Sequence, residues 1–241
     1  MRPQKKVNHF PSKLSVVIPA YNEIKRLPEA LAVCRQWQQR FPNWEFIFVN
    51  DGSSDETAKA ITGFKVVGYP VNRGKGYALK MGVAKASKPF VLICDLDFST
   101  PLSELKLLYP FVEGNTDLAI GSRKVTGANV LKHQSPLREW LGHQFTNLSK
   151  AWLGLTVTDV TCGFKLFKLE TAKKLFAASR ISRWGYDAEI LFLAKKYGLK
   201  VADVPVTWTN DERTKVNVLR DIFNSLSDLL AIRLNDLMGK Y

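Results

Sequence analysis

The stretch VLICDLDFSTPLSEL, residues 91–105, joins an apolar run to a helical pattern through a pair of carboxylates. The run lacks polar alternation, which is typical of a parallel strand buried on both faces. Residues two apart in a strand point to the same side, so we expect Asp95 and Asp97 to lie close together at its end. Two like charges so close favour a cation between them, and a hard divalent metal meets that need. A solvated turn, in which Ser99 and Thr100 cap the next helix, explains the same residues.

The same order of apolar run, polar loop and helical pattern recurs along the chain. The runs with strand character are LSVVIPA (14–20), WEFIFVN (44–50), KVVGYP (65–70), PFVLICDLD (89–97) and TDLAIGSR (116–123). Helical patterns separate them, which predicts an α/β fold with a single, mostly parallel sheet flanked by helices. Such sheets bind ligands at the carboxyl ends of their strands. The polar clusters YNE, NDGSSD, NRGKG, DLD and GSRK stand at those ends.

The pattern changes after residue 123. Residues 124–136 are polar and aperiodic, which predicts a mobile loop, and residues 137–155 follow as a helix. The run VADVPVTW, residues 201–208, predicts a last strand. The final segment, residues 216–238, predicts an amphipathic helix that packs either on the sheet or in a membrane interface. Its apolar stripe consists of Leu219, Ile222, Phe223, Leu226, Leu229, Leu230 and Leu237.

Charge and composition limit the class of partner. The chain has 35 Lys and Arg against 22 Asp and Glu, a net charge of +13, which favours polyanions such as nucleic acid, an anionic membrane or a phosphorylated substrate. No nucleic-acid-binding motif occurs, so we expect no nucleic acid partner. The three cysteines, Cys34, Cys94 and Cys162, fit buried thiols in a reducing compartment. Neither a signal peptide nor an apolar run of membrane-spanning length is visible.

The polar clusters together suit a nucleotide. The carboxylate of Asp51 can accept a hydrogen bond from a base, and Arg73 or Lys75 can meet phosphate. Gly74 and Gly76 would let a ligand approach the backbone closely. A metal on the aspartate pair can bridge a diphosphate. The RGKG cluster alone matches neither the P-loop nor the Gly-x-Gly-x-x-Gly pattern, and an exposed basic turn explains it equally.

The motifs VVIPAYNE, VNDGSSD, NRGKGYALKMG and DLD resemble those of the inverting glycosyltransferase family 2, which has the GT-A fold. The segments TCGFKLF, RWGYDAEILFLAKKYGLKVADVPVTW and LRDIFNSLSDLLAIRL are similar to the dolichyl-phosphate β-glucosyltransferases and their prokaryotic relatives. The polyprenyl-phosphate mannose synthases share much of this pattern. The resemblance covers nearly the whole chain.

The resemblance implies a nucleoside-diphosphate sugar as donor, a polyprenyl or dolichyl phosphate as acceptor, and Mg²⁺ or Mn²⁺ as cofactor. It implies donor binding by Pro19, Tyr21, Glu23, Asp51, Arg73, Lys75 and Asp95. It implies catalytic roles for Asp95, Asp97, Asp159 and Arg123, with Asp97 as metal ligand, and contacts to the acceptor phosphate from Arg123, Arg138, Arg213 and Lys215. Taken alone, each of these arginines fits a solvated surface charge.

Two departures from the family pattern leave parts of the site open. The mannose synthases often have Gln where this chain has Ser99, so a third metal ligand is not assigned. The sequence ERTK, residues 212–215, replaces a Gly-Ser-Lys type of sequence in the loop expected to contact the acceptor.

Three reactions follow from this reading. A phosphate acceptor is already anionic and needs no general base, and we expect glucose to be the sugar transferred. GDP-mannose is the alternative donor. A hydroxyl acceptor is the alternative acceptor, and it would require a base such as Asp159 or Asp187, although helix capping also explains Asp187.

The predicted organisation is a flexible basic arm, residues 1–13, and one catalytic domain, residues 14–241. Within the domain we expect a nucleotide-sugar half (14–123), an acceptor half (124–217) and the amphipathic helix (218–241). The basic arm predicts a protein bound peripherally to an anionic membrane surface on its cytoplasmic face.

Overall fold

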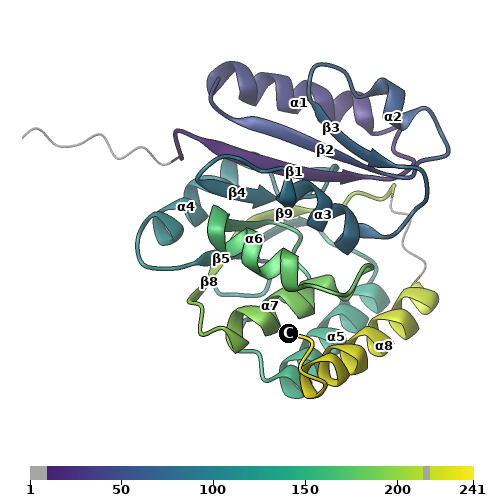
Figure 1. The fold of residues 1–241 in the computed structure, drawn as a ribbon, viewed down its shortest axis with the longest axis vertical. Coiled ribbons are helices and arrows are strands. Elements are labelled where there is room, and N and C mark those ends of the chain that lie inside the picture. The colour runs from purple at the N-terminus through teal and green to yellow at the C-terminus, as the bar shows by residue number, and fades with distance from the viewer. Residues whose placement is uncertain (1–9, 214–217) are drawn as a thin grey trace, which may run out of the picture.

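The computed structural model describes residues 10–213 and 218–241, and a seven-stranded sheet forms its centre (Figure 1). In spatial order the strands are β3 (Lys65–Tyr69), β2 (Glu45–Asp51), β1 (Leu14–Ala20), β4 (Phe90–Ile93), β7 (Lys165–Lys168), β5 (Leu118–Ser122) and β8 (Val201–Pro205). All strands run in one direction except β7, which is antiparallel to both of its neighbours, β4 and β5. The predicted mostly parallel α/β sheet is therefore confirmed.

Helices cover both faces of this sheet. They are α1 (Leu27–Arg40), α2 (Thr57–Ala60), α3 (Lys75–Ala84), α4 (Leu105–Glu113), α5 (Pro136–Leu153), α6 (Leu169–Ala178), α7 (Tyr186–Lys196) and α8 (Val218–Leu237). On one face α1 and α4 pack with Val16 and Ile18 of β1, and on the other α3, α6 and α7 pack with Val17. Burial on both faces is why the strands lack polar alternation.

The segment predicted as a mobile loop, residues 124–136, contains a strand, so the prediction of a loop throughout is wrong. Strand β6 (Asn129–Lys132) pairs in parallel with β9 (Thr207–Thr209) in a second, two-stranded sheet. The predicted strand over 201–208 is divided between the two sheets at Val206, whose N–H donates to Ser122 O (3.2 Å) before β9 begins. The partner of β6 lies far away in sequence, and so the local pattern of residues 124–136 could not reveal it.

Helix α8 packs one face on the core, as predicted, and its contact with a membrane interface stays a prediction. Leu229 and Ile232 are buried in the core, whereas Leu230 and Leu237 are exposed. The side chains of Leu219, Ile222 and Phe223 and the first nine residues of the predicted arm lie outside the description. Within residues 10–213 and 218–241, no helix has the length and hydropathy needed to cross a bilayer.

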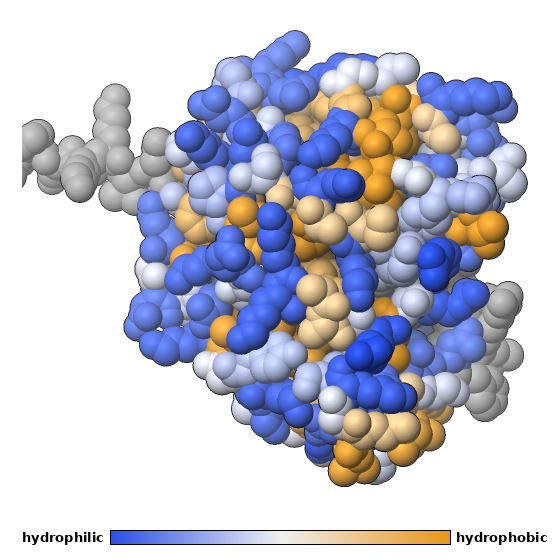
Figure 2. Space-filling model, in the orientation of Figure 1, coloured by the Kyte–Doolittle hydropathy of each residue, from blue (hydrophilic) through white to orange (hydrophobic). Residues whose placement is uncertain are grey.

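Helices α5 and α8 pack against each other and carry exposed apolar side chains. Figure 2 shows apolar residues at the lower end of the molecule, where α8 lies in Figure 1. We call this set the α5/α8 apolar surface. Its members are Leu137, Trp140, Leu148 and Trp152 on α5, and Leu226, Leu230, Leu234 and Leu237 on α8, followed by Met238.

Candidate active site

The loops at the carboxyl ends of the parallel strands meet at one edge of the sheet, as the sequence predicted. The loops after β1 and β2 are joined through Asn22, whose side-chain oxygen accepts hydrogen bonds from the N–H groups of Ser54 (2.7 Å) and Asp55 (3.3 Å). Asn22 has a φ of 55°, a conformation that asparagine tolerates better than most residues. Asn22 directly follows Tyr21, which is 40% exposed, and Pro19 is half-buried near the end of β1.

Asp51 organises the glycine-rich loop that follows β3. Its buried carboxylate accepts hydrogen bonds from the N–H groups of Arg73 (2.8 Å) and Gly74 (2.9 Å) and from the side chain of Asn72 (2.8 Å). Sequence reasoning missed this role. The contact between Asp51 and a base stays a prediction. Arg73 points to the surface, where its guanidinium lies 3.9 Å from the ring centroid of Tyr77.

Gly74 and Gly76 allow another segment of the chain to pack closely against this loop, whereas the sequence led us to expect a ligand there. A Cβ atom on Gly74 would lie 2.5 Å from Ser182 O, and one on Gly76 would lie 2.6 Å from Ile181 O. Both positions are therefore closed to side chains, because the segment before α7 packs against them. This packing brings Trp184 to the site, with its ring centroid 5.4 Å from Lys75 Nζ.

Asp95 and Asp97 lie in a turn beyond the strand, because β4 ends at Ile93. The expectation that strand alternation places them on one side is therefore wrong, although both reach the site. Asp95 contacts Lys75 Nζ at 2.5 Å. Burial alone would raise the pKa of Asp95, but the Lys75 ammonium outweighs it and holds that pKa below its usual value.

Asp97 faces a different environment from Asp95. Its Oδ1 accepts a hydrogen bond from the Ser99 N–H (3.0 Å). The next helical turn, η1 (Leu102–Glu104), has Pro101 at its N-cap position, so the alternative that Ser99 and Thr100 cap it is wrong. Burial, with the nearby charge of Asp95, raises the pKa of Asp97.

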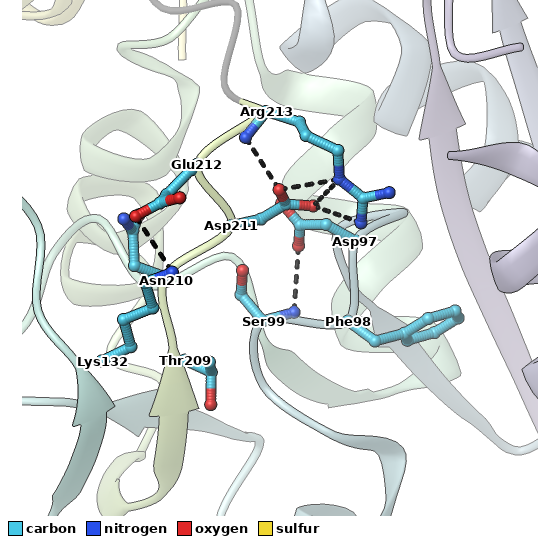
Figure 3. A pocket seen from close by; sticks show the side chains of 9 residues that line it. All are labelled: Asp97, Phe98, Ser99, Lys132, Thr209, Asn210, Asp211, Glu212 and Arg213. Carbon is cyan, nitrogen blue, oxygen red and sulfur yellow. Dashed lines mark hydrogen bonds and ion pairs between the residues drawn. The ribbon is translucent and has the colours of Figure 1, made fainter. Parts of the chain in front are cut away.

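The side chain of Asp97 lines a hollow of about 440 Å³ (Figure 3). The lining residues are Asp97, Phe98, Ser99, Lys132, Thr209, Asn210, Asp211, Glu212 and Arg213. In Figure 3 the carboxylates of Asp97 and Asp211 lie side by side, and Glu212 is paired with Lys132 (2.9 Å). The Thr209 N–H donates to Ser99 O (2.8 Å) and so joins the segment that carries residues 210–213 to the turn that carries Asp97.

Arg26 joins three carboxylates at this place. Its guanidinium forms a fork with Glu23, at 2.7 Å from Nε and 2.6 Å from Nη2. Its Nη1 lies 3.4 Å from Asp97 Oδ2 and 3.5 Å from Asp211 Oδ2. Sequence reasoning missed Arg26 and Asp211. A signal for Arg26 was its spacing of three residues from Glu23, which is favourable for an ion pair in a helical turn.

Arg123 and Asp159 form a buried ion pair beside the end of β5. The fully buried carboxylate of Asp159 accepts two hydrogen bonds from the Arg123 guanidinium, from Nε (2.7 Å) and Nη2 (2.9 Å). Burial alone would raise the pKa of Asp159, but Arg123 outweighs it and holds that pKa well below its usual value. Lys124 extends toward α5 and donates to Thr146 Oγ1 (2.7 Å), a contact that sequence reasoning did not anticipate.

The other residues predicted to meet the acceptor phosphate are dispersed. Arg138 is half-buried in the first turn of α5. Arg213 is exposed, and its guanidinium contacts Asp211 and Glu29, each at 3.0 Å. Lys215 lies outside the described residues. The roles of Arg138, Arg213 and Lys215 stay predictions.

Asp187 does not cap α7, so the capping interpretation is wrong. It lies inside the first turn, after Tyr186, and its buried carboxylate contacts the fully buried ammonium of Lys165. This pair neighbours the one between Lys75 and Asp95, so the base of the site consists of paired lysines and aspartates.

The donor atoms around Asp97 suit Mg²⁺ or Mn²⁺, because both metals prefer carboxylate oxygen. In the part of the chain that is described, no group of three or more His, Cys, Asp or Glu side chains is arranged to hold a metal ion. The protein would therefore supply part of the coordination shell, and diphosphate oxygens and water would complete it. Asp97 would hold the metal at the rim of the hollow.

Sequence comparison shows the family of the chain and its similar relatives. The family model described as glycosyl transferase family 2 matches residues 15–176. The Homo sapiens dolichyl-phosphate beta-glucosyltransferase is 33% identical over 253 residues, which cover 95% of this chain and 77% of the human protein. The Drosophila melanogaster enzyme of the same name is 34% identical with the same coverage.

Structural comparison gives the same fold. The glucosyl-3-phosphoglycerate synthase from Mycobacterium tuberculosis has a TM-score of 0.68 at 20% identity, over 91% of this chain and 79% of that one. A complex of that enzyme with Mn²⁺, UDP-glucose and phosphoglyceric acid has a TM-score of 0.65 at 21% identity over the same shares. Mannosyl-3-phosphoglycerate synthase from Rubrobacter xylanophilus has a TM-score of 0.67 at 17% identity, over 95% of this chain and 76% of that one.

Proposed function

Because this chain belongs to glycosyl transferase family 2, we propose that it transfers glucose from UDP-glucose to a polyprenyl phosphate such as dolichyl phosphate, with inversion at the anomeric carbon. The family resemblance and the GT-A fold predicted from the motifs are confirmed. The names of the relatives support glucose and the lipid acceptor. The complex of the mycobacterial enzyme with Mn²⁺ and UDP-glucose supports the donor and the metal.

One observation carries the choice of a phosphate acceptor. A hydroxyl acceptor needs a general base, and the two candidates, Asp159 and Asp187, are buried in ion pairs with Arg123 and Lys165. A carboxylate whose pKa is held far below its usual value, as for Asp159, is a poor base. Burial raises the pKa of Asp187, but its carboxylate is paired with the buried Lys165 ammonium and is nearly closed to solvent. A phosphate monoester is an anion near neutral pH and needs no base. The site therefore favours a phosphate nucleophile.

The reaction we propose is a single in-line displacement. A phosphate oxygen of the lipid forms a bond to the anomeric carbon while the bond from that carbon to the UDP oxygen breaks. The electron pair leaves with UDP, and no proton is transferred in the step. Inversion follows from attack opposite the leaving group, and so an α-linked donor gives a β-linked product.

Residues of this chain would place the two substrates. Lys75, at the N-terminus of α3, would attract the donor diphosphate together with the helix N-terminus. Arg123, held rigidly by Asp159, would meet the acceptor phosphate with Lys124 beside it. Asp97 would hold the divalent metal, which when bound would stabilise negative charge on the departing diphosphate.

We place the enzyme peripherally on the cytoplasmic face of a membrane. The α5/α8 apolar surface and the net charge of +13 support contact with an anionic bilayer. Both helices begin near the site, since α5 follows the strand that ends at Lys132 and α8 begins five residues after Arg213. Cys34, Cys94 and Cys162 are free thiols, which supports the reducing side of the membrane.

A donor panel tests this function. Purified protein with Mg²⁺ or Mn²⁺ and a short polyprenyl phosphate receives UDP-glucose, UDP-galactose, UDP-GlcNAc or GDP-mannose, and mass spectrometry detects the lipid product. We expect glucosyl phosphoryl lipid from UDP-glucose, lost with EDTA and reduced by at least about a hundredfold in Asp97→Ala.

The other outcomes separate the alternatives. A product from GDP-mannose alone would replace glucose by mannose. Metal-dependent binding of a sugar nucleotide without any lipid product would overturn the acceptor, and a panel of hydroxyl acceptors would follow. A hydroxyl product that disappears in Asp159→Asn or Asp187→Asn would identify the base.

A further inference from the structure

We infer that Asp211 completes, with Asp97, the protein's share of the metal position, and that Arg26 holds this position before the metal binds. The inference rests on the proposed function, because it concerns the divalent cation of that reaction. It makes Asp211 a metal ligand that the sequence motifs do not mark, and Arg26 a positioning residue.

The first step is the position of one cationic atom. Arg26 Nη1 lies within 3.5 Å of a carboxylate oxygen of both Asp97 and Asp211. Both carboxylates line the same hollow, which is large enough for a metal with its remaining ligands (Figure 3). A single cation between the two loops can therefore serve both carboxylates.

The second step is that the Arg26 guanidinium lies closer to Glu23 than to Asp97 or Asp211. Its contacts with Glu23, at 2.6 and 2.7 Å, have ordinary hydrogen-bond length. Its contacts with Asp97 and Asp211, at 3.4 and 3.5 Å, exceed the usual range of about 2.7–3.2 Å. A Mg²⁺ ion binds carboxylate oxygen at about 2.1 Å. The metal can therefore displace Nη1 from the two aspartates while the fork with Glu23 stays in place.

The third step separates Asp211 from the neighbouring carboxylates. Asp95 is engaged by Lys75 at 2.5 Å. Glu212 belongs to the same loop as Asp211, but it is 72% exposed at its side chain and is paired with Lys132 at 2.9 Å. Asp211 is 13% exposed and is also paired with the exposed Arg213 at 3.0 Å, but of these three carboxylates it is the one that shares Arg26 with Asp97. Glu212 is therefore a matched control of equal charge.

Calorimetric titration with Mn²⁺, with and without UDP, tests the assignment without measuring turnover. We expect Asp97→Asn and Asp211→Asn to weaken Mn²⁺ binding by at least about tenfold each. Glu212→Gln should change it by less than about twofold. Arg26→Gln should tighten it by about two- to fivefold, because a competing cation is lost. Arg35→Gln, which removes the same charge from the exposed side of α1, should change it by less than about twofold.

Several outcomes would overturn the inference. Equal effects of Asp211→Asn and Glu212→Gln would remove Asp211 from the metal position, and weaker binding in Arg26→Gln would show that Arg26 supports the site structurally. If Mn²⁺ does not bind to the unaltered protein even with UDP, the metal of the proposed function fails as well. Anomalous diffraction from a Mn²⁺-soaked crystal of the unaltered protein needs no variant to fold. A peak between Asp97 and Asp211 supports the assignment, and a peak distant from Asp211 contradicts it.

Discussion

At the scale of single residues, the site is built from carboxylates that are already paired with groups of the same chain. Asp51 accepts three hydrogen bonds from the loop after β3, Asp95 contacts Lys75, and Asp159 holds Arg123. Sequence patterns identified these residues but assigned most of them directly to ligands. Their partners could not be predicted, because each pair joins two loops that only the sheet brings together.

The pair of Arg123 and Asp159 gives a prediction for stability. Replacing Arg123 by Met would leave a carboxylate buried without its cation, and we expect a loss of about 3–5 kcal/mol in the free energy of unfolding at about pH 8. The pKa of Asp159 is low in the unaltered protein, so this group does not titrate between about pH 8 and pH 5. In Arg123→Met, burial without the arginine raises that pKa above the value in the unfolded chain.

The sign of the pH effect follows from this change. Protonation of a buried acid with a raised pKa favours the folded state, so the loss in Arg123→Met should shrink as the pH falls from about 8 to about 5. Urea unfolding at three pH values measures it. Adding Asp159→Asn to the variant should remove most of this pH dependence, and a loss that stays constant with pH would contradict the account.

At the scale of elements, the periodicity of the apolar residues predicted where strands occur along the chain. It did not predict how those strands are ordered and paired in the sheet. The strands β1, β2, β4 and β5 occur where the pattern placed them, because their burial is continuous, although β4 ends earlier than predicted. The pattern did not reveal the antiparallel direction of β7 or the pairing of β6 with β9, since direction and pairing depend on chain segments far apart.

Helix α8 carries the prediction at this scale. Leu230 and Leu234 are 55% and 57% exposed, so replacing both with Ser should leave the free energy of unfolding nearly unchanged, within about 0.5 kcal/mol each. If the α5/α8 apolar surface enters the bilayer, the double variant should bind vesicles with anionic lipid at least about tenfold more weakly. Sedimentation with vesicles measures the partition coefficient.

The matched control lies on α4, which packs on the opposite face of the sheet. Leu107 and Phe111 are 37% and 46% exposed, and Ser at both positions removes a similar apolar area. Vesicle binding should be unaffected by this change. Equal losses in the two double variants would mean that the α5/α8 apolar surface has no special part in membrane contact.

At the scale of the whole molecule, charge and apolar surface would act together on a membrane. The net charge of +13 gives long-range attraction to anionic lipid, whereas the α5/α8 apolar surface acts only on contact. Salt screens the electrostatic attraction but does not weaken the apolar contact. The Debye length falls from about 10 Å at 0.1 M to about 3 Å at 1 M.

This difference predicts a salt-dependent affinity for anionic vesicles. Between about 0.05 and 0.5 M salt we expect binding to anionic vesicles to fall by about tenfold or more, while binding to neutral vesicles stays weak and nearly constant. The rate of glucosyl transfer to lipid in the same vesicles should follow the bound fraction. Identical binding to neutral and anionic vesicles at low salt would contradict an electrostatic component.

Strand β7 has a consequence for how the protein is made. It lies between β4 and β5, so the middle of the sheet stays open until residues 165–168 have been synthesised. A nascent chain that ends at Arg123 would expose two unpaired strand edges, one on each side of the gap, and such edges invite association with other chains. We therefore expect the first half of the chain to stay incompletely folded until the second half has been synthesised. Folding on the ribosome should be complete only after β7 has left the exit tunnel.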